Sequence, residues 1–230
     1  MKKLVPLLVW LLAAAVPTLA QAQKAEVAPG ISVTRKTYRV PDNEAPFFNF
    51  ADKNEAQKAA DKKLVDAVLE RVPDRTRAAG TAIDAGMRAF LSDNDFATAA
   101  KRFNQAYLLH PQHSGVYHGF ALVAAARFKD FGYADELFRL AARMKSPAPP
   151  LAADHGRTLL IAGRPAEAKA LLEQAVKDTP GWAVPRMNLA WAALQTGNRA
   201  EACRLITQVK GQDLESVERD LALFKQKAGC

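Results

Sequence analysis

The sequence predicts an all-α fold: a right-handed α-solenoid of about four helix pairs, with a capping helix at each end and an extended N-terminal arm. Three observations support this prediction. Four similar segments begin with a small residue, at Ala99, Ala134, Ala168 and Ala202, so their spacing is 35, 34 and 34 residues. Apolar residues recur with helical periodicity from residue 54 onward, and turn residues separate the helical stretches. A period near 34 residues is typical of a repeated helix-turn-helix unit.

Residues 1–22 have the pattern of a secretory signal peptide. Lys2 and Lys3 precede an apolar stretch, and Ala20-Gln21-Ala22 supplies a small-residue cleavage site. We therefore expect cleavage near Ala22 and a periplasmic protein without a membrane span. An uncleaved membrane anchor is the alternative, which the prolines inside the apolar stretch disfavour.

Residues 23–52 form the predicted extended arm. The segment from Ile31 to Val40 is rich in β-branched residues, but the sequence shows no evident strand to pair with it, and an isolated strand is not stable in water. Phe47, Phe48 and Phe50 then place three aromatic rings within four positions. This cluster either packs on the helical body, which we favour, or inserts into a partner. A third arrangement, in which the arm plugs the binding groove, stays open.

The remaining chain divides into a capping helix, a repeat region and a second capping helix. Residues 53–73 carry an apolar stripe at helical spacing that ends before Pro73, and we assign them to the N-terminal cap. Residues 74–212 hold the four repeats. Residues 213–230 hold the C-terminal capping helix and tail, because Leu214, Val217, Leu221 and Phe224 fall on one helical face.

The order of small and large residues within a repeat identifies the family. The third repeat has Gly156, Leu159, Ala168, Leu172, Ala175 and Pro180 at the places where a tetratricopeptide repeat has small, large, small, large, alanine and proline. The first repeat differs at Met87, with Gly86 one residue early; the second needs one inserted residue; the fourth lacks the proline. Residues 80–214 therefore resemble four tetratricopeptide repeats.

This resemblance implies a concave groove, lined by the first helix of each pair, that binds a protein or peptide partner. The family's groove places fall on Asp84, Arg88, His118, Leu122, Arg157, Leu160, Met187, Asn188 and Trp191. The C-terminal half of this groove is apolar, and we interpret Trp191 as a recognition residue, with core packing as the alternative. Arg88 and Arg157 would orient acidic groups of the partner.

Two cysteines are present, Cys203 and Cys230. In an oxidising compartment they could form a disulfide, which on the chain-entropy relation would contribute on the order of 3 kcal/mol. The alternative is a buried Cys203 and a free or intermolecular Cys230.

The sequence favours a protein without catalytic residues, metal or cofactor. His110, His113 and His118 lie close in sequence, but no Cys, Asp or Glu lies among them to complete a metal site. Asp154 and His155 are adjacent on a helix and therefore point apart, which argues against a catalytic dyad. The sequence also contains no nucleophile-elbow, phosphate-loop or zinc-protease motif.

The composition is that of a folded protein, with 49% hydrophobic and 24% charged residues. The formal net charge is +8, but Lys and Arg are dispersed among Asp and Glu, so we expect no nucleic-acid partner. The sequence thus predicts a non-catalytic periplasmic scaffold or adaptor, acting for example in cell-envelope assembly. The alternatives are a chaperone-like holder of unfolded or secreted polypeptides and an accessory subunit of polysaccharide or pilus export machinery.

Overall fold

The computed structural model describes residues 23–210 and 214–230. The predicted signal peptide, residues 1–22, lies outside the described residues. Within the described ranges, no helix has both the length and the apolar character required to cross a membrane.

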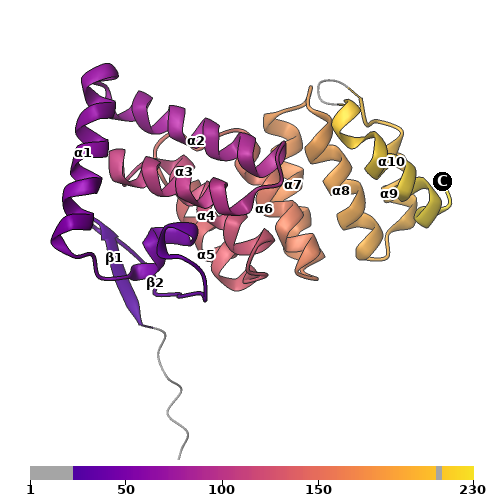
Figure 1. Ribbon diagram of the computed structural model, residues 1–230. Coiled ribbons are helices and arrows are strands. Elements are labelled where there is room, and N and C mark those ends of the chain that lie inside the picture. The colour runs from indigo at the N-terminus through magenta and orange to yellow at the C-terminus, as the bar shows by residue number, and fades with distance from the viewer. Residues whose placement is uncertain (1–22, 211–213) are drawn as a thin grey trace, which may run out of the picture.

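The chain forms a row of helices that pack in consecutive pairs (Figure 1). The first pair is α2 (Arg75–Leu91) with α3 (Phe96–Leu109), and the second is α4 (Ser114–Ala126) with α5 (Phe131–Ala142). The third is α6 (Pro150–Ile161) with α7 (Pro165–Asp178), and the fourth is α8 (Ala183–Gln195) with α9 (Arg199–Ile206). Helix α1 (Glu55–Arg71) precedes the pairs and α10 (Leu214–Ala228) follows them.

In three of the four pairs a side chain caps the start of the second helix, whereas α7 has no side-chain cap and begins with Pro165. Asp95 accepts a hydrogen bond from the Thr98 amide at the start of α3, and Asp130 accepts one from the Tyr133 amide at the start of α5. Asn198 accepts a hydrogen bond from the Glu201 amide at the start of α9. Because such caps satisfy amides that have no partner within the helix, they define where α3, α5 and α9 begin.

Small residues allow the two helices of a pair to approach closely. Ala99, Ala134, Ala168 and Ala202, which lead the four segments, are all fully buried. The Phe103 ring packs directly over Gly86, where an added Cβ would lie 2.5 Å from its Cε1 atom. Gly86, rather than Met87, is therefore the residue that lets α2 approach α3.

The N-terminal region is more structured than the extended arm we expected. Strand β1 (Lys24–Ala28) pairs in antiparallel fashion with β2 (Ile31–Thr34) across a turn at Gly30, whose φ is +74°. The expectation that the segment beginning at Ile31 has no partner strand was therefore wrong, and its strand covers Ile31–Thr34. The body supports the hairpin, because Glu136 of α5 accepts a hydrogen bond from the Thr34 amide and forms an ion pair with Lys24 at 2.7 Å.

The aromatic cluster packs on the helical body through a left-handed turn. Two 3-10 turns follow the hairpin, η1 (Asp42–Glu44) and η2 (Pro46–Phe50), and in η2 the four residues from Phe47 to Phe50 have φ between 52° and 57°. Non-glycine residues rarely adopt this conformation, which costs about 1–2 kcal/mol per residue. Phe47 is 5% exposed and contacts the rings of Tyr107, Tyr117 and Phe120.

Asn104 of α3 holds the turn in place. Its side chain accepts a hydrogen bond from the Phe48 amide and donates to the carbonyl groups of Asn43 and Ala45, at 2.8–3.1 Å. The arm thus makes most of its polar contacts with α3, α5 and the adjacent turns. Helices α3 and α5 are the second helices of their pairs, whereas the predicted groove is lined by the first helices. The arm therefore does not occupy the predicted groove.

Helix α1 covers the N-terminal end of the array loosely. Its cap is Asn54, which forms a reciprocal capping box with Gln57. None of the residues Glu55–Arg71, all of which are described, is fully buried, although Val65, Val68 and Leu69 pack against the core at partial exposure. The buried residues form two clusters: one extends from Val27 to Leu151, and the other from Leu159 to Ala228. The two clusters meet within α6.

Candidate protein-binding site

The structure separates the nine predicted groove residues into accessible and buried groups. Asp84 and Arg88 of α2 are exposed, and Arg157 and Trp191 are partly exposed. The buried group, each at most 8% exposed, consists of His118, Leu122, Leu160, Met187 and Asn188. The prediction that this second group lines an open groove was wrong, except for Leu160, which borders the hollow described below.

The buried polar members of this group join neighbouring repeats. His118 of α4 lies 2.8 Å from a carboxylate oxygen of Asp154 in α6 (Nε2 to Oδ2), and Asn188 of α8 donates to the Ala153 carbonyl of α6 at 3.3 Å. The first helices of successive repeats therefore contact one another directly, and these side chains fill the contact. The family places alone do not show this, because they give the position on a helix but not the distance between helices.

A hollow lies near the C-terminal end of the array, between α6, α8 and α10. It has a volume of about 200 Å³. Arg157, Leu160 and Trp191, all predicted as groove residues, lie together here. The hollow is completed by Ile161, Gln195, Asp220 and Leu223. Ile161 is 63% exposed and Leu223 is 43% exposed, so large apolar side chains flank the hollow and face solvent.

Trp191 is held at the hollow by the C-terminal helix. Its ring meets the buried Phe224 ring edge-on, at a centroid distance of 4.9 Å. The Lys227 ammonium lies 5.8 Å from the centre of the Trp191 ring. The indole Nε1 is shielded from solvent and has no hydrogen-bond partner among the described residues. Trp191 thus packs in the core and also lines the hollow, and its role as a recognition residue stays a prediction.

One edge of the hollow is an ion pair between helices. The Arg157 guanidinium lies 2.8 Å from the Asp220 carboxylate of α10. Arg157, which we expected to orient acidic groups of a partner, is therefore engaged with an acidic group of its own chain. Asp220 and Leu223 were missed by sequence reasoning, because the family's groove places lie only on the first helix of each pair.

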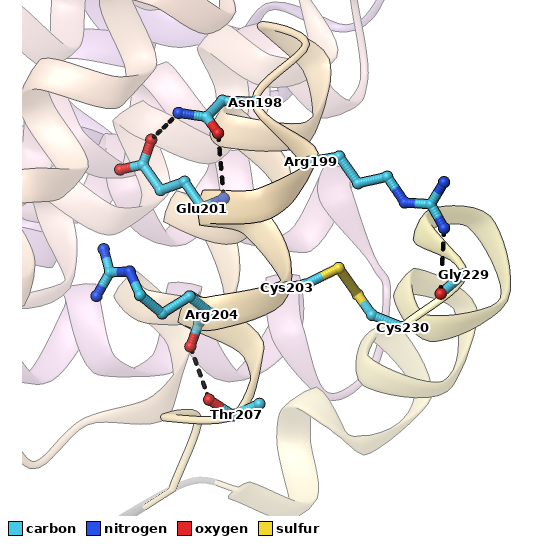
Figure 2. The surroundings of a disulfide bond; sticks show 8 residues. All are labelled: Asn198, Arg199, Glu201, Cys203, Arg204, Thr207, Gly229 and Cys230. Carbon is cyan, nitrogen blue, oxygen red and sulfur yellow. Dashed lines mark hydrogen bonds between the residues drawn. A yellow bond between two sulfur atoms is a disulfide. The ribbon is translucent and has the colours of Figure 1, made fainter.

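The two cysteines form a disulfide that ties the end of the chain to α9 (Figure 2). Cys203 of α9 is joined to Cys230, and their Cα atoms are 5.8 Å apart, within the range usual for disulfides. Figure 2 also shows the Arg199 side chain donating to the Gly229 carbonyl, at 3.1 Å. Helix α10, which forms the third wall of the hollow, is therefore fixed at its C-terminal end by one covalent bond and one hydrogen bond.

A second cluster of charged groups lies between the second and third repeats. Asp135 of α5 receives hydrogen bonds from His155 at 2.7 Å and Arg139 at 2.9 Å, and forms an ion pair with Arg164 at 2.8 Å. Burial raises the pKa of Asp135, but these partners outweigh burial, so its pKa lies below the usual value. Burial also lowers the pKa of His155 despite the adjacent carboxylate.

This cluster joins the second repeat to the third, because Asp135 lies on α5 while His155 and Arg164 lie at α6 and at the start of α7. His155 contacts Asp135 rather than the adjacent Asp154, and its ring stacks on Phe138 at 4.9 Å. Among residues 23–210 and 214–230, no group of three His, Cys, Asp or Glu side chains is placed to hold a metal ion.

Comparisons with known proteins identify the type of repeat. A family model described as "Tetratricopeptide repeat" matches residues 159–219. Among solved structures, the crystal structure of PilW, described as a widely conserved type IV pilus biogenesis factor, resembles this chain with a TM-score of 0.52. The identity is 17%, and the match covers 77% of this chain and 86% of PilW. No curated protein matches the chain. The comparisons thus confirm an all-α array of helix pairs.

Proposed function

Because this chain is a tetratricopeptide repeat protein, we propose that it is a non-catalytic adaptor of the cell envelope that binds a protein partner in the hollow between α6, α8 and α10. The observation that carries the proposal is the exposure of Ile161 and Leu223 on either side of this hollow. Apolar side chains grouped around a concave site and bordered by polar residues are typical of interaction surfaces.

The size and chemistry of the hollow favour one kind of occupant. A cavity of about 150 Å³ lined by apolar side chains accepts a benzene ring, so a hollow of about 200 Å³ has room for one large apolar side chain. Arg157, Asp220 and Gln195 give it a polar edge that can bond to main-chain groups. The partner would therefore insert a leucine or phenylalanine side chain from an exposed segment.

Several features support an envelope location. The first 22 residues have the pattern of a secretory signal peptide. A disulfide is typical of proteins in oxidising compartments, such as the bacterial periplasm. PilW is described as a pilus biogenesis factor, and assembly of an envelope structure is the process in which we would first look for a partner.

Site-specific crosslinking tests the site in the native cell. A photoreactive benzoylphenylalanine at position 161 should crosslink to one envelope protein on irradiation. The same group at position 91 is the matched control, because Leu91 is 73% exposed but lies on α2, outside the hollow. Equal crosslinking from both positions, or none from position 161, would contradict the proposed site.

Affinity measurements with the captured protein then test the chemistry. Ile161→Asp places a charge at the apolar edge, and losing the burial of one large aliphatic side chain costs about 1.5–3 kcal/mol, which corresponds to a roughly 10- to 150-fold weaker Kd. Leu91→Asp should leave the Kd unchanged. A Kd for Ile161→Asp within twofold of the wild-type value would show that the hollow does not contribute to binding.

A further inference from the structure

The third wall of the hollow is a helix with few buried contacts. Helix α10 has 15 residues, and among its described side chains only those of Val217, Phe224 and Ala228 are fully buried. An isolated helix of this length is marginal in water, so tertiary contacts must keep α10 in place. The same helix supplies Asp220 and Leu223 to the hollow.

The connection between α10 and α9 is concentrated at the end of the chain. Cys230 is joined to Cys203 of α9, and the neighbouring Gly229 carbonyl accepts the hydrogen bond from Arg199 (Figure 2). Cys230 is exposed and Cys203 is partly exposed, so a thiolate in solution can reach the bond. The covalent connection therefore lies at the end of α10 and is open to attack.

We propose that the Cys203–Cys230 disulfide is a redox-operated latch that keeps α10 in place as the third wall of the hollow. In the oxidised chain α10 packs against α8, and Leu223 and Asp220 complete the hollow. In the reduced chain α10 separates from α8, and the hollow loses that wall. The biological use of the latch rests on the proposed function, but the latch itself is a property of this chain alone.

The reductant is a dithiol, such as a dithiol oxidoreductase of the envelope. Its first thiolate attacks the sulfur of Cys230, so that a mixed disulfide forms, the Cys203–Cys230 bond breaks, and Cys203 leaves as a thiolate that takes a proton from water. The second thiolate of the reductant then attacks the reductant's sulfur in the mixed disulfide. The mixed disulfide breaks, and Cys230 leaves as a thiolate that takes a proton from water. The chain gains two electrons and two protons, and the dithiol becomes a disulfide.

The expected size of the effect follows from loop closure. The bond closes a loop with a sequence separation of 27 residues. Opening a loop of this length increases the number of accessible unfolded conformations by about 100-fold or more. Hydrogen exchange of the α10 amides reports this directly, because their protection reflects the ratio of closed to open α10.

The test compares hydrogen exchange of the oxidised full chain, of the same chain in dithiothreitol, and of the double variant Cys203→Ser with Cys230→Ser. Both altered samples should lose at least 100-fold protection in α10, while α2 to α7 keep theirs and show that the array remains folded. Dithiothreitol should change nothing further in the double variant, which controls for effects of the reagent. Unchanged protection of α10 in the reduced chain would overturn the latch.

Crosslinking from position 161 separates the latch from the proposed function. Crosslinking in the oxidised chain and its loss in the double variant support both. If position 161 crosslinks equally in the two forms, control of the hollow by the disulfide is overturned while the binding site stands. If position 161 crosslinks nothing in either form, the proposed binding site is contradicted, and hydrogen exchange still decides whether the disulfide holds α10.

Discussion

The Phe103 ring is enclosed between two glycines, and substituting one of them tests the packing that sets the spacing of the first two repeats. Gly86 of α2 lies on one side and Gly119 of α4 on another. A Cβ at Gly86 would lie 2.5 Å from Phe103 Cε1 and 2.8 Å from Cδ1. Carbon atoms pack best at about 3.5–4.0 Å, so the ring would have to move by about 1 Å. A Cβ at Gly119 would lie 2.5 Å from the same Cε1 atom, so movement toward α4 is restricted as well.

We expect Gly86→Ala to lower the free energy of unfolding. Overpacking a well-packed core costs about 1–3 kcal/mol, and replacing glycine by alanine inside a helix recovers up to about 1 kcal/mol. The net destabilisation should be about 1–2 kcal/mol. The matched control is Gly80→Ala in the same helix, where no heavy atom lies within 4 Å of the added Cβ. This control should gain up to about 1 kcal/mol in stability.

Urea unfolding followed by far-ultraviolet circular dichroism measures both changes. The two alanine variants should differ in free energy of unfolding by about 2 kcal/mol, and Gly80→Ala should be the more stable. Equal stabilisation by both substitutions would show that the Phe103 ring has room to move, and the packing argument for the repeat spacing would then be incorrect.

Two further predictions concern the N-terminal region and the junction between repeats. Asn104→Ala removes three hydrogen bonds to the backbone of the arm, and each buried backbone group left unpaired costs about 1–3 kcal/mol. Limited proteolysis should therefore cleave the arm faster in the variant while the helix pairs stay protected. Unchanged cleavage would refute the anchoring role of Asn104. Burial depresses the pKa of His155 below its unfolded value, so the stability that His155 contributes is present above about pH 6.5 and is lost as the pH falls toward the folded-state pKa. His155→Gln should therefore reduce the loss of stability between about pH 7 and 5, and denaturant titrations that show the same pH slope for variant and wild type would contradict this.

The helix pairs could be predicted from sequence because each pair carries its own pattern. The leading alanines occupy the same place in every repeat and are all buried, as the spacing indicates. The caps Asp95, Asp130 and Asn198 are local signals, since each bonds to an amide three residues onward. The hairpin could not be found in this way, because Lys24–Ala28 contains Lys, Glu and Ala, which are weak strand formers. Its stability depends on Glu136, more than 100 residues later in the chain.

The candidate site was only partly predictable, for a related reason. Arg157, Leu160 and Trp191 were found from their places within the repeat. Asp220 and Leu223 lie on α10 away from the apolar stripe that identified this helix, and they became visible only when its packing against α8 was known. His118 and Asn188 were wrongly placed in an open groove, because the hydrogen bonds that bury them come from the neighbouring repeat.

The N-terminal arm has a mechanical consequence for the whole array. By bonding to Asn104 of α3 and Glu136 of α5, it spans two successive repeats and stiffens them against bending. The disulfide braces the opposite end. We therefore expect the array to bend most easily at α6, where the two apolar clusters meet and where Asp135 and His155 join neighbouring repeats through a polar contact. Under a pulling or twisting load, we expect the curvature of the array to change first at this hinge.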